Sequence, residues 1–302
     1  MSTRATLIVA VAMLAAIVAC TVPGATPPTA FVLPTPNQTL TAIFAPTSAA
    51  TLEPPPATEA TTTIAVTPVV TQAGLTSSTV GPLSSRPNGS PVEAGRLTTP
   101  PVIDGDLADW STSAFNATQV VYGATRWSGL NDVSAVYYIG WDEANLYLGA
   151  RVTDDKYVQV SSGSSLYLGD GLEIQLDANL AADFYTAEVD TDDYQVGLSA
   201  GNFAAISPQA YRWYPAALRG APSGVVIAGK TSATGYNLEA KVPWTVFGLT
   251  AVNGARYGFA LSVSDNDAAG TAAQQSMVSS VSTRTLLNPT TWGTLILVGG
   301  GS

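Results

Sequence analysis

The chain has 302 residues, a net charge of −10 at pH 7, one cysteine and no histidine. An acidic chain is a poor partner for nucleic acid or for an anionic membrane surface, and its charge is compatible with bound cations. Without histidine, and with its only cysteine at position 20, the chain has no Ser-His-Asp or Cys-His centre and no histidine-ligated zinc or haem. The composition therefore argues against most enzyme classes.

The N-terminal segment predicts secretion. Arg4 precedes an apolar run over residues 5–18 that is too short to cross a bilayer as a stable helix. The run ends in Ile17-Val18-Ala19-Cys20, which resembles the lipobox of bacterial lipoproteins. We predict a signal peptide at residues 1–19, lipidation of Cys20, and a location outside the cytoplasm at the cell surface, with membrane contact through the lipid anchor only. An ordinary cleaved signal with an incidental cysteine is the alternative.

The next segment has a different composition. Residues 21–95 hold 13 of the 20 prolines and 16 threonines, and all six Trp and twelve Tyr come later. Such a segment cannot bury enough apolar surface to offset the entropy lost on ordering. We predict a disordered Pro/Thr-rich stalk over residues 20–95 and one folded domain over residues 96–302.

Short runs with a period of two recur through the folded part. They indicate β-strands at residues 133–139, 145–153, 172–177, 236–242, 257–263 and 295–297. Gly, Asn and Asp cluster between these runs, and no long amphipathic helix is indicated. Pro243 and Gly248 bracket one short helical turn. The pattern predicts an all-β fold, namely an antiparallel β-sandwich of jelly-roll or immunoglobulin-like type.

The most informative strand is residues 172–177, where three apolar residues alternate with three polar ones. The apolar set is Leu172, Ile174 and Leu176, and the polar set is Glu173, Gln175 and Asp177. Because alternate residues face opposite sides of a strand, we expect a half-buried strand with one row of hydrogen-bonding groups. Tyr167 stands just before it. An aromatic ring beside such a row suits a sugar, which has apolar faces and hydroxyl edges.

The order of several motifs resembles carbohydrate-binding module family 9 and its wider DOMON-like relatives. The matching blocks are Ile103-Asp104-Gly105 with Asp109-Trp110, then residues 141–147, 152–155, 169–174, 235–236, 242–244, 263–267 and 288–295. The resemblance implies a β-sandwich that binds poly- or oligosaccharide without catalysis, in carbohydrate catabolism or in attachment to cell-surface glycans. Any glycoside hydrolase activity would then come from another chain. The resemblance also implies structural calcium.

In sugar-binding members of that family two Trp rings clamp a terminal sugar. Tyr167 takes the place of one of them, six residues before Glu173, whereas Leu287 stands where the second is expected. Our candidate carbohydrate-binding residues are Tyr167, Glu173, Gln175, Tyr194, Trp213 and Arg151. Two alternatives stay open: loop aromatics can be lids of the core, and Arg151 with Glu173 can be a charge pair on a solvated sheet.

Short groups of aspartates in expected turns are candidate calcium ligands, because calcium takes six to eight oxygen ligands. Our candidates are Asp106, Asp154, Asp265 and Asp267. The alternative is that these aspartates only form local turn hydrogen bonds.

Two other functions are compatible with the sequence. One is a structural or adhesion domain that has lost the sugar site, which the leucine at position 287 favours. The other is a DOMON-like haem module for electron transfer, with Met277 and a lysine as axial ligands.

Overall fold

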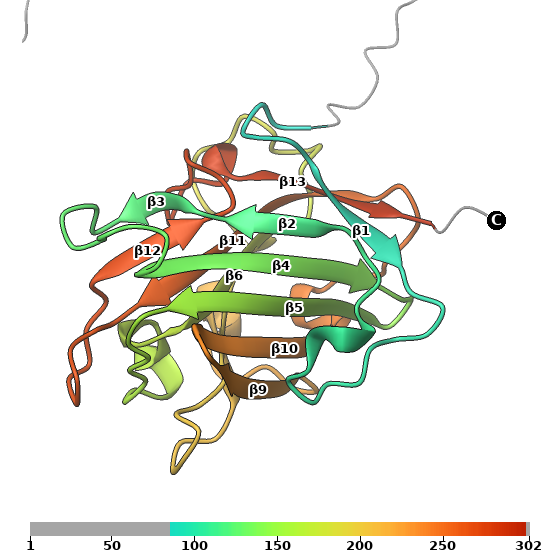
Figure 1. The fold of residues 1–302 in the computed structure, drawn as a ribbon. Helices are drawn as coiled ribbons and strands as arrows, with labels where there is room; N and C mark the ends of the chain where they lie inside the picture. Colours follow the sequence, from blue (N-terminus) through green and yellow to red (C-terminus); the bar gives the residue numbers. More distant parts are fainter. Residues whose placement is uncertain (1–84, 300–302) are drawn as a thin grey trace, which may run out of the picture. The chain divides into compact units, whose positions relative to one another are not determined.

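Alternating apolar and polar residues build two layers of strands in the computed structural model, which describes residues 85–299 (Figure 1). The strands are β1 (Val92–Arg96), β2 (Ala114–Ala117), β3 (Gln119–Tyr122), β4 (Val133–Trp141), β5 (Asn145–Asp154), β6 (Gly171–Asp177), β7 (Asp193–Ser199), β8 (Gln209–Tyr214), β9 (Val226–Ser232), β10 (Gly235–Pro243), β11 (Arg256–Asp265), β12 (Ser276–Ser279) and β13 (Gly293–Val298). The predicted signal peptide, Cys20 and residues 20–84 of the predicted stalk lie outside the described residues.

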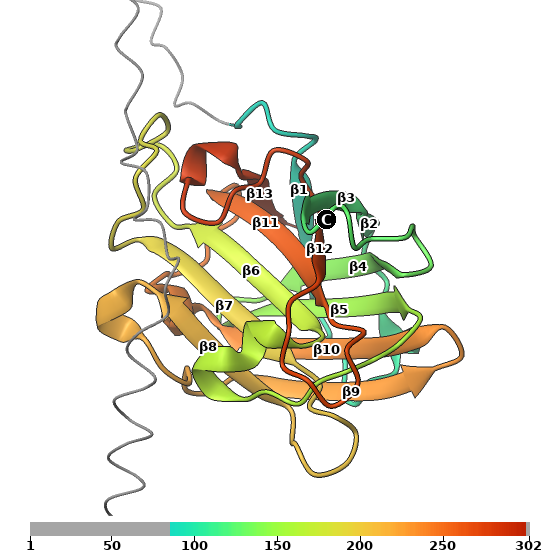
Figure 2. The ribbon, with the colours of Figure 1, turned by 90° about the vertical axis from the view of Figure 1, so that its left-hand side faces the viewer.

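The predicted β-sandwich is confirmed. One layer contains β2, β4, β5, β10 and β9, and the other contains β8, β7, β6, β11, β13 and β12 (Figure 2). Neighbouring strands are antiparallel throughout each layer, as expected. The exception is β1, which pairs in parallel with both β13 and β4.

Strand β1 joins the two layers. Its residues Val92 to Gly95 pair with β13, and Gly95 and Arg96 pair with β4. Residues 85–95, which we assigned to the stalk from their composition, therefore include a strand of the sheet. Composition could not separate them from the stalk because this strand is short and contains no aromatic residue.

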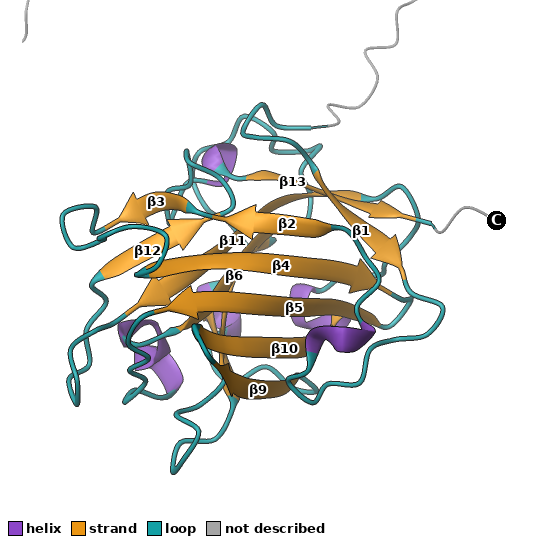
Figure 3. Ribbon diagram, in the orientation of Figure 1, coloured by secondary structure: helices purple, strands orange, loops and turns teal. Residues whose placement is uncertain are grey.

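Only short helical turns interrupt the strands (Figure 3). In the described part they are the 3-10 helices η1 (Leu107–Asp109), η2 (Gly163–Leu168), η3 (Ala216–Leu218), η4 (Trp244–Phe247) and η5 (Pro289–Thr291). Helix η4 confirms the predicted turn, with Pro243 before it and Gly248 after it in the left-handed conformation. None of the helices formed by residues 85–299 is long and apolar enough to span a membrane.

The inward faces of the two layers meet in one apolar core. Leu148 and Val152 of β5 and Leu238 of β10 contribute from one layer, and Ile174 of β6 and Leu261 of β11 from the other. All five side chains are fully or almost fully buried. This core fixes the register of β6 and therefore decides which of its side chains face away from the core.

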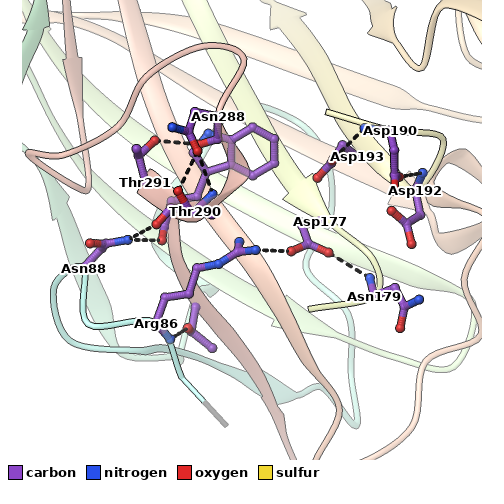
Figure 4. A network of polar contacts seen from close by, with 12 residues as sticks. Arg86, Asn88, Asp177, Asn179, Asp190, Asp192, Asp193, Asn288, Thr290 and Thr291 are labelled. Carbon is purple, nitrogen blue, oxygen red and sulfur yellow. Dashed lines mark hydrogen bonds and ion pairs between the residues drawn. The ribbon is translucent and has the colours of Figure 1, made fainter. Parts of the chain in front are cut away.

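The outward face of β6 is also covered, which corrects the prediction of a half-buried strand. Every residue of β6 is buried, and Glu173 is only 3% exposed. Arg86, from the segment before β1, pairs with Asp177 at 2.7 Å (Figure 4). Arg284, from the segment after β12, reaches Glu173. The strand pattern could not reveal this cover, since both segments are distant from β6 in the sequence.

Candidate functional site

A cavity of about 470 Å³ opens on the outward side of the layer that contains β6, β7 and β8. Its lining residues come from strands β3, β6, β7, β8 and β12, from helix η2 and from the loops beside them: Val121, Tyr122, Tyr167, Glu173, Gln195, Trp213, Tyr214, Arg219, Gln274, Met277, Arg284, Thr285 and Leu286. The volume lies within the range typical of small-molecule sites. Most of the lining is aromatic or apolar, and a few polar groups converge at its base.

The carboxylate of Glu173 is the centre of the polar contacts. Its Oε2 atom accepts hydrogen bonds from Nε2 of Gln195 at 3.0 Å and from Nε2 of Gln175 at 3.2 Å. Nη2 of Arg284 lies 3.3 Å from the same oxygen. Gln175 faces the same side of β6 as Glu173 because the two are separated by one residue. These contacts hold the Glu173 side chain in one position.

Tyr167 and Trp213 form an aromatic corner beside Glu173. Their ring centroids are 6.0 Å apart and their planes are inclined by 77°. Trp213 Nε1 donates to the carbonyl oxygen of Ser164 at 2.9 Å, which fixes the indole. Tyr167 is 40% exposed, so part of its ring is available to a ligand. The two rings are therefore adjacent walls of a corner and not the parallel walls of a clamp.

A glycine on β7 makes room for the tryptophan. A Cβ atom at Gly197 would lie 2.5 Å from the indole of Trp213. Gly197 is paired with Glu173 across the β6–β7 ladder, so the indole packs on the sheet directly beside the polar centre. Any larger residue at position 197 would displace the ring.

Two arginines give the cavity a positive character within an acidic chain. Arg284 is 7% exposed, and burial lowers its pKa while the neighbouring Glu173 carboxylate opposes that shift. Arg219 is exposed at the rim, where its Nε donates to the carbonyl oxygen of Trp213 at 3.5 Å. Glu173 is the only carboxylate that lines the cavity in the described part of the chain. The cavity thus offers several hydrogen-bond donors and one fixed acceptor.

The structure brings together some of the residues that the sequence suggested. Tyr167, Glu173 and Trp213 line the cavity, and Gln175 lies behind Glu173 with no exposed surface. Tyr194 belongs to the core, where its ring contacts Phe247.

Arg151 is also away from the cavity, and it does not pair with Glu173. It lies on β5 and is matched with Asn237 of β10, in the opposite layer from β6. Neither Tyr194 nor Arg151 therefore lines the cavity.

Gln195 also lines the cavity, and it is directly paired with Gln175 on the neighbouring strand, in agreement with the polar alternation of β7. Other lining residues were not predicted. Arg284, Tyr122 and Leu286 come from segments whose sequence gives no such signal. Leu286, 44% exposed, occupies the cavity edge near the position where an aromatic clamp residue was expected.

Two of the predicted calcium ligands lie together. Asp154 and Asp265 form a buried group with Asp170, in which one carboxylate oxygen of each residue lies within 4.8 Å of the others. Oδ2 of Asp154 and Oδ1 of Asp265 have no hydrogen-bond partner among the described residues. Burial raises the pKa of Asp154 to about 6 and that of Asp265 to about 7, and nearby carboxylates add to both shifts. This oxygen-rich group fits the ligand preference of calcium.

The other two predicted ligands have different surroundings. Asp267 groups with Asp132 and Asp155, and its charge raises the pKa of Asp154, so the two groups are close neighbours. Asp106 lies apart from both groups. Its Oδ2 is 3.4 Å from Nζ of Lys230, and its Oδ1 accepts from the backbone of Ala108 at the start of η1.

The Asp-Gly motif near the start of the domain has a structural role. The carboxylate of Glu239 on β10 accepts hydrogen bonds from the backbone N–H groups of Asp104 and Gly105, at 3.0 and 2.7 Å, and from Nε1 of Trp110, at 2.6 Å. Gly105 has a φ of +86°, and a Cβ atom there would meet the backbone of Gly229. These contacts attach the loop that precedes β2 to β10, in the layer opposite the cavity.

Comparisons with known proteins place the chain in a family. The sequence model described as "Carbohydrate family 9 binding domain-like" matches residues 103–300. Two curated relatives, the exoglucanase XynX of Acetivibrio thermocellus and the endo-1,4-beta-xylanase A of Thermoanaerobacterium saccharolyticum, are each 28% identical over 170 residues. That match covers 56% of this chain but only 14% and 13% of those relatives.

Solved structures support the same fold. Two are of a carbohydrate-binding module family 9 protein from Caldicellulosiruptor kristjanssonii, one in complex with cellotriose and one with glucose. Each has a TM-score of 0.53 and 23% identity and covers 70% of this chain, with 95% and 97% of the neighbour matched. The family model matches more than half of the chain, in the region that forms the sandwich. The chain therefore belongs to the carbohydrate family 9 binding domain-like family.

Proposed function

We propose that this protein binds an oligosaccharide in the cavity beside Glu173 and does not cleave it. The observation that carries the proposal is that an aromatic corner, Tyr167 and Trp213, and a fixed carboxylate, Glu173, line the same cavity of about 470 Å³. A sugar ring can place an apolar face on an aromatic side chain while its hydroxyl groups donate to Glu173 and accept from Gln195 and Arg284.

Glucose-based oligosaccharides are the first ligands to consider. The two structural neighbours were solved with cellotriose and with glucose, which supports this choice. The aromatic corner leaves the cavity open on the side of Leu286 and Tyr122, which are 44% and 51% exposed. We propose that these two side chains contact the sugar unit next to the one held at Glu173.

A binding role without hydrolysis agrees with the charges of the cavity. Hydrolysis of a glycosidic bond commonly needs two carboxyl groups about 5 to 9.5 Å apart. In the described part of the chain, Glu173 is the only carboxylate that lines the cavity, and it is engaged by Arg284. We propose that any hydrolase acting on the same polysaccharide resides on another chain. The protein would then serve carbohydrate catabolism or attachment to a glycan surface.

The proposal extends to location and calcium. We propose that lipidation at Cys20 and the Pro/Thr-rich stalk hold the module outside the cytoplasm. We further propose a calcium ion at Asp154, Asp170 and Asp265, because two carboxylate oxygens of this buried group have no hydrogen-bond partner among the described residues. Asp267, in the neighbouring group, would add negative charge near the ion.

The test is titration calorimetry of the purified protein with glucose, cellotriose and xylotriose. We expect saturable binding of at least one sugar, weakened at least tenfold by Tyr167→Ala or Trp213→Ala. Tyr185→Ala is a matched control, since Tyr185 is 78% exposed and does not line the cavity. If a folded, calcium-loaded protein binds no member of a wider glycan panel, the proposal fails and the structural or adhesion role gains support.

A further inference from the structure

One arginine at the rim of the cavity has a charge that no described residue balances. Arg219 lines the cavity and is exposed. Within residues 85–299, the only hydrogen bond of its side chain runs from Nε to the carbonyl oxygen of Trp213, at 3.5 Å. No ion pair formed by these residues includes Arg219, whereas the other lining arginine, Arg284, is paired with Glu173. The guanidinium of Arg219 is therefore available to an anion in the cavity.

The loop that carries Arg219 is held in one place. Arg219 follows η3 in the connection between β8 and β9. Arg212 of β8 and Gly220 exchange two backbone hydrogen bonds, of 2.8 and 3.0 Å, which close the loop. The guanidinium of Arg212 donates to the carbonyl oxygens of Leu218 and Val246, each at 2.8 Å. A fixed backbone thus places an unpaired cationic side chain beside the aromatic corner of the cavity.

The charge of the cavity differs from that of the whole chain. The chain has 22 acidic and 12 basic residues, and this excess of negative charge repels anions from the chain as a whole. In the described part, the cavity is lined by two arginines, Arg219 and Arg284, and by one carboxylate, that of Glu173. Because Arg284 and Glu173 balance each other, the cavity keeps one positive charge. A neutral sugar makes no use of that charge, but a sugar with a carboxylate does.

We infer that Arg219 binds the carboxylate of a uronic acid unit, and that the glycan recognised in this cavity is therefore an acidic one. The inference rests on the proposed function, because the sugar must first lie in the cavity beside the aromatic corner. A planar guanidinium can bind a carboxylate through two parallel hydrogen bonds, which a single hydroxyl group cannot reproduce. The Nη groups of Arg219 are the donors, since its Nε donates to the carbonyl oxygen of Trp213.

The net charge of the chain limits how acidic the glycan is. A polymer with a carboxylate on every unit would bring many negative charges close to an acidic protein, and Arg219 is the one unpaired cation that lines the cavity in the described part. A neutral backbone with isolated uronic acid side groups avoids this repulsion, while one carboxylate still reaches Arg219. The ligand class is therefore a neutral glycan that carries single uronic acid side groups.

The test is titration calorimetry of the purified protein with three probes. They are xylotriose, xylotriose that carries one glucuronic acid side group, and the same acidic sugar with its carboxyl group reduced to an alcohol. The last two differ only in the carboxylate, so the ratio of their dissociation constants isolates the effect of its charge. Neutral xylotriose tests the proposed function independently of that ratio.

The variants are Arg219→Gln, Arg219→Lys and a matched control, Arg151→Gln. Arg151 is an exposed arginine of β5, in the layer opposite the cavity, and it does not line the cavity. Arg151→Gln changes the net charge of the chain by the same amount as Arg219→Gln. A general effect of net charge would therefore appear in both variants.

We expect the acidic probe to bind the unmodified protein and Arg151→Gln about five to ten times more tightly than its reduced counterpart. In Arg219→Gln the two probes should bind equally. Arg219→Lys should give an intermediate ratio, because an ammonium group keeps the charge but loses the planar pair of donors. In the unmodified protein the ratio should fall towards one at about 1 M sodium chloride, where charges more than about 3 Å apart are screened.

The possible failures are distinguishable. If xylotriose binds and the acidic probe binds no more tightly than its reduced counterpart, the inference is overturned while the proposed function stands. If none of the probes and no neutral glycan binds, both fail. If the acidic probe keeps its advantage in Arg219→Gln, the assignment of its carboxylate to Arg219 is overturned.

Discussion

Glu173 of β6 and Arg284 of the segment after β12 form a buried ion pair across 111 residues of sequence, with 3.3 Å between Oε2 and Nη2. Both side chains are almost fully buried at the base of the cavity. The pair therefore has two roles. The guanidinium of Arg284 balances the negative charge of Glu173, whose carboxylate is the centre of the proposed sugar site. The pair also holds the segment after β12 against the outward face of β6.

The first prediction concerns this pair. Arg284→Met should lower the free energy of unfolding by about 3 kcal/mol, since loss of one partner leaves the Glu173 charge buried and uncompensated. The double variant Glu173→Gln/Arg284→Met should recover most of that loss, because it removes both charges. Neither variant should bind sugar. Urea denaturation and calorimetry measure the two quantities. A double variant as unstable as Arg284→Met alone would show that the pair is not the cause.

The second prediction concerns the glycine beneath the tryptophan. In Gly197→Ala the added Cβ would lie 2.5 Å from the Trp213 indole, so the ring must move away from the sheet. We expect sugar affinity to fall about tenfold, which corresponds to about 1.4 kcal/mol. Stability should change less, since Trp213 is partly exposed. Calorimetry and tryptophan fluorescence test this.

Gly95→Ala is the control for that variant. The nearest atom to a Cβ there, a methyl group of Thr112, would be at an ordinary contact distance of 3.7 Å. Unchanged sugar affinity in Gly197→Ala would contradict the assignment of Trp213 as a wall of the site.

The sandwich could be predicted because the evidence for each strand lies within a few consecutive residues of the sequence. A period of two marks each strand, and turn residues mark the connections. Strand β6 shows what such a pattern predicts correctly and what it cannot predict. Its alternation correctly separated Ile174, which packs in the core, from Glu173, which faces the cavity. The same pattern suggested solvent on the polar side, because alternation does not reveal whether a distant segment covers that side.

Much of the site was predictable from that strand and from the aromatic residues of the chain. Tyr167 and Glu173 were found beside or on β6, and Trp213 was found as an aromatic candidate, while Arg284 and Leu286 come from an irregular segment far along the chain. Tyr194 shows the opposite error. It looked like a loop aromatic beside Gln195, but its parity on β7 directs it into the core, where it contacts Phe247. Recognising β7 as a strand would have corrected that choice.

The third prediction separates fold from binding. Glu239→Gln should weaken three hydrogen bonds that hold the loop with Asp104, Gly105 and Trp110. Hydrogen bonds to a charged group contribute more than neutral ones, so we expect a loss of about 1 to 3 kcal/mol in the free energy of unfolding. Sugar affinity should stay unchanged, because Glu239 lies in the layer opposite the cavity. If Glu239→Gln lowered the sugar affinity without lowering the free energy of unfolding, a purely structural role of Glu239 would be contradicted.

The final prediction concerns where the folded module begins. The sheet includes β1, and Arg86 before it pairs with Asp177 at 2.7 Å. Its backbone N–H also donates to Oγ1 of Thr294, at 2.9 Å. Gly258 leaves space for the guanidinium, because a Cβ atom there would lie 2.3 Å from Nη1 of Arg86. A protein that starts at residue 85 should therefore melt well above one that starts at residue 96.

The point variant Arg86→Met isolates the contribution of the ion pair from that of β1. It should lose about 3 kcal/mol or more, since Asp177 would stay buried without its cation. Arg126→Met is the matched control, because Arg126 is exposed and forms no ion pair within residues 85–299. Thermal and urea melts of all four proteins provide the comparison. Equal stability of the two truncated proteins would mean that residues 85–95 do not contribute to the free energy of unfolding. Arg86→Met would then be as stable as its control.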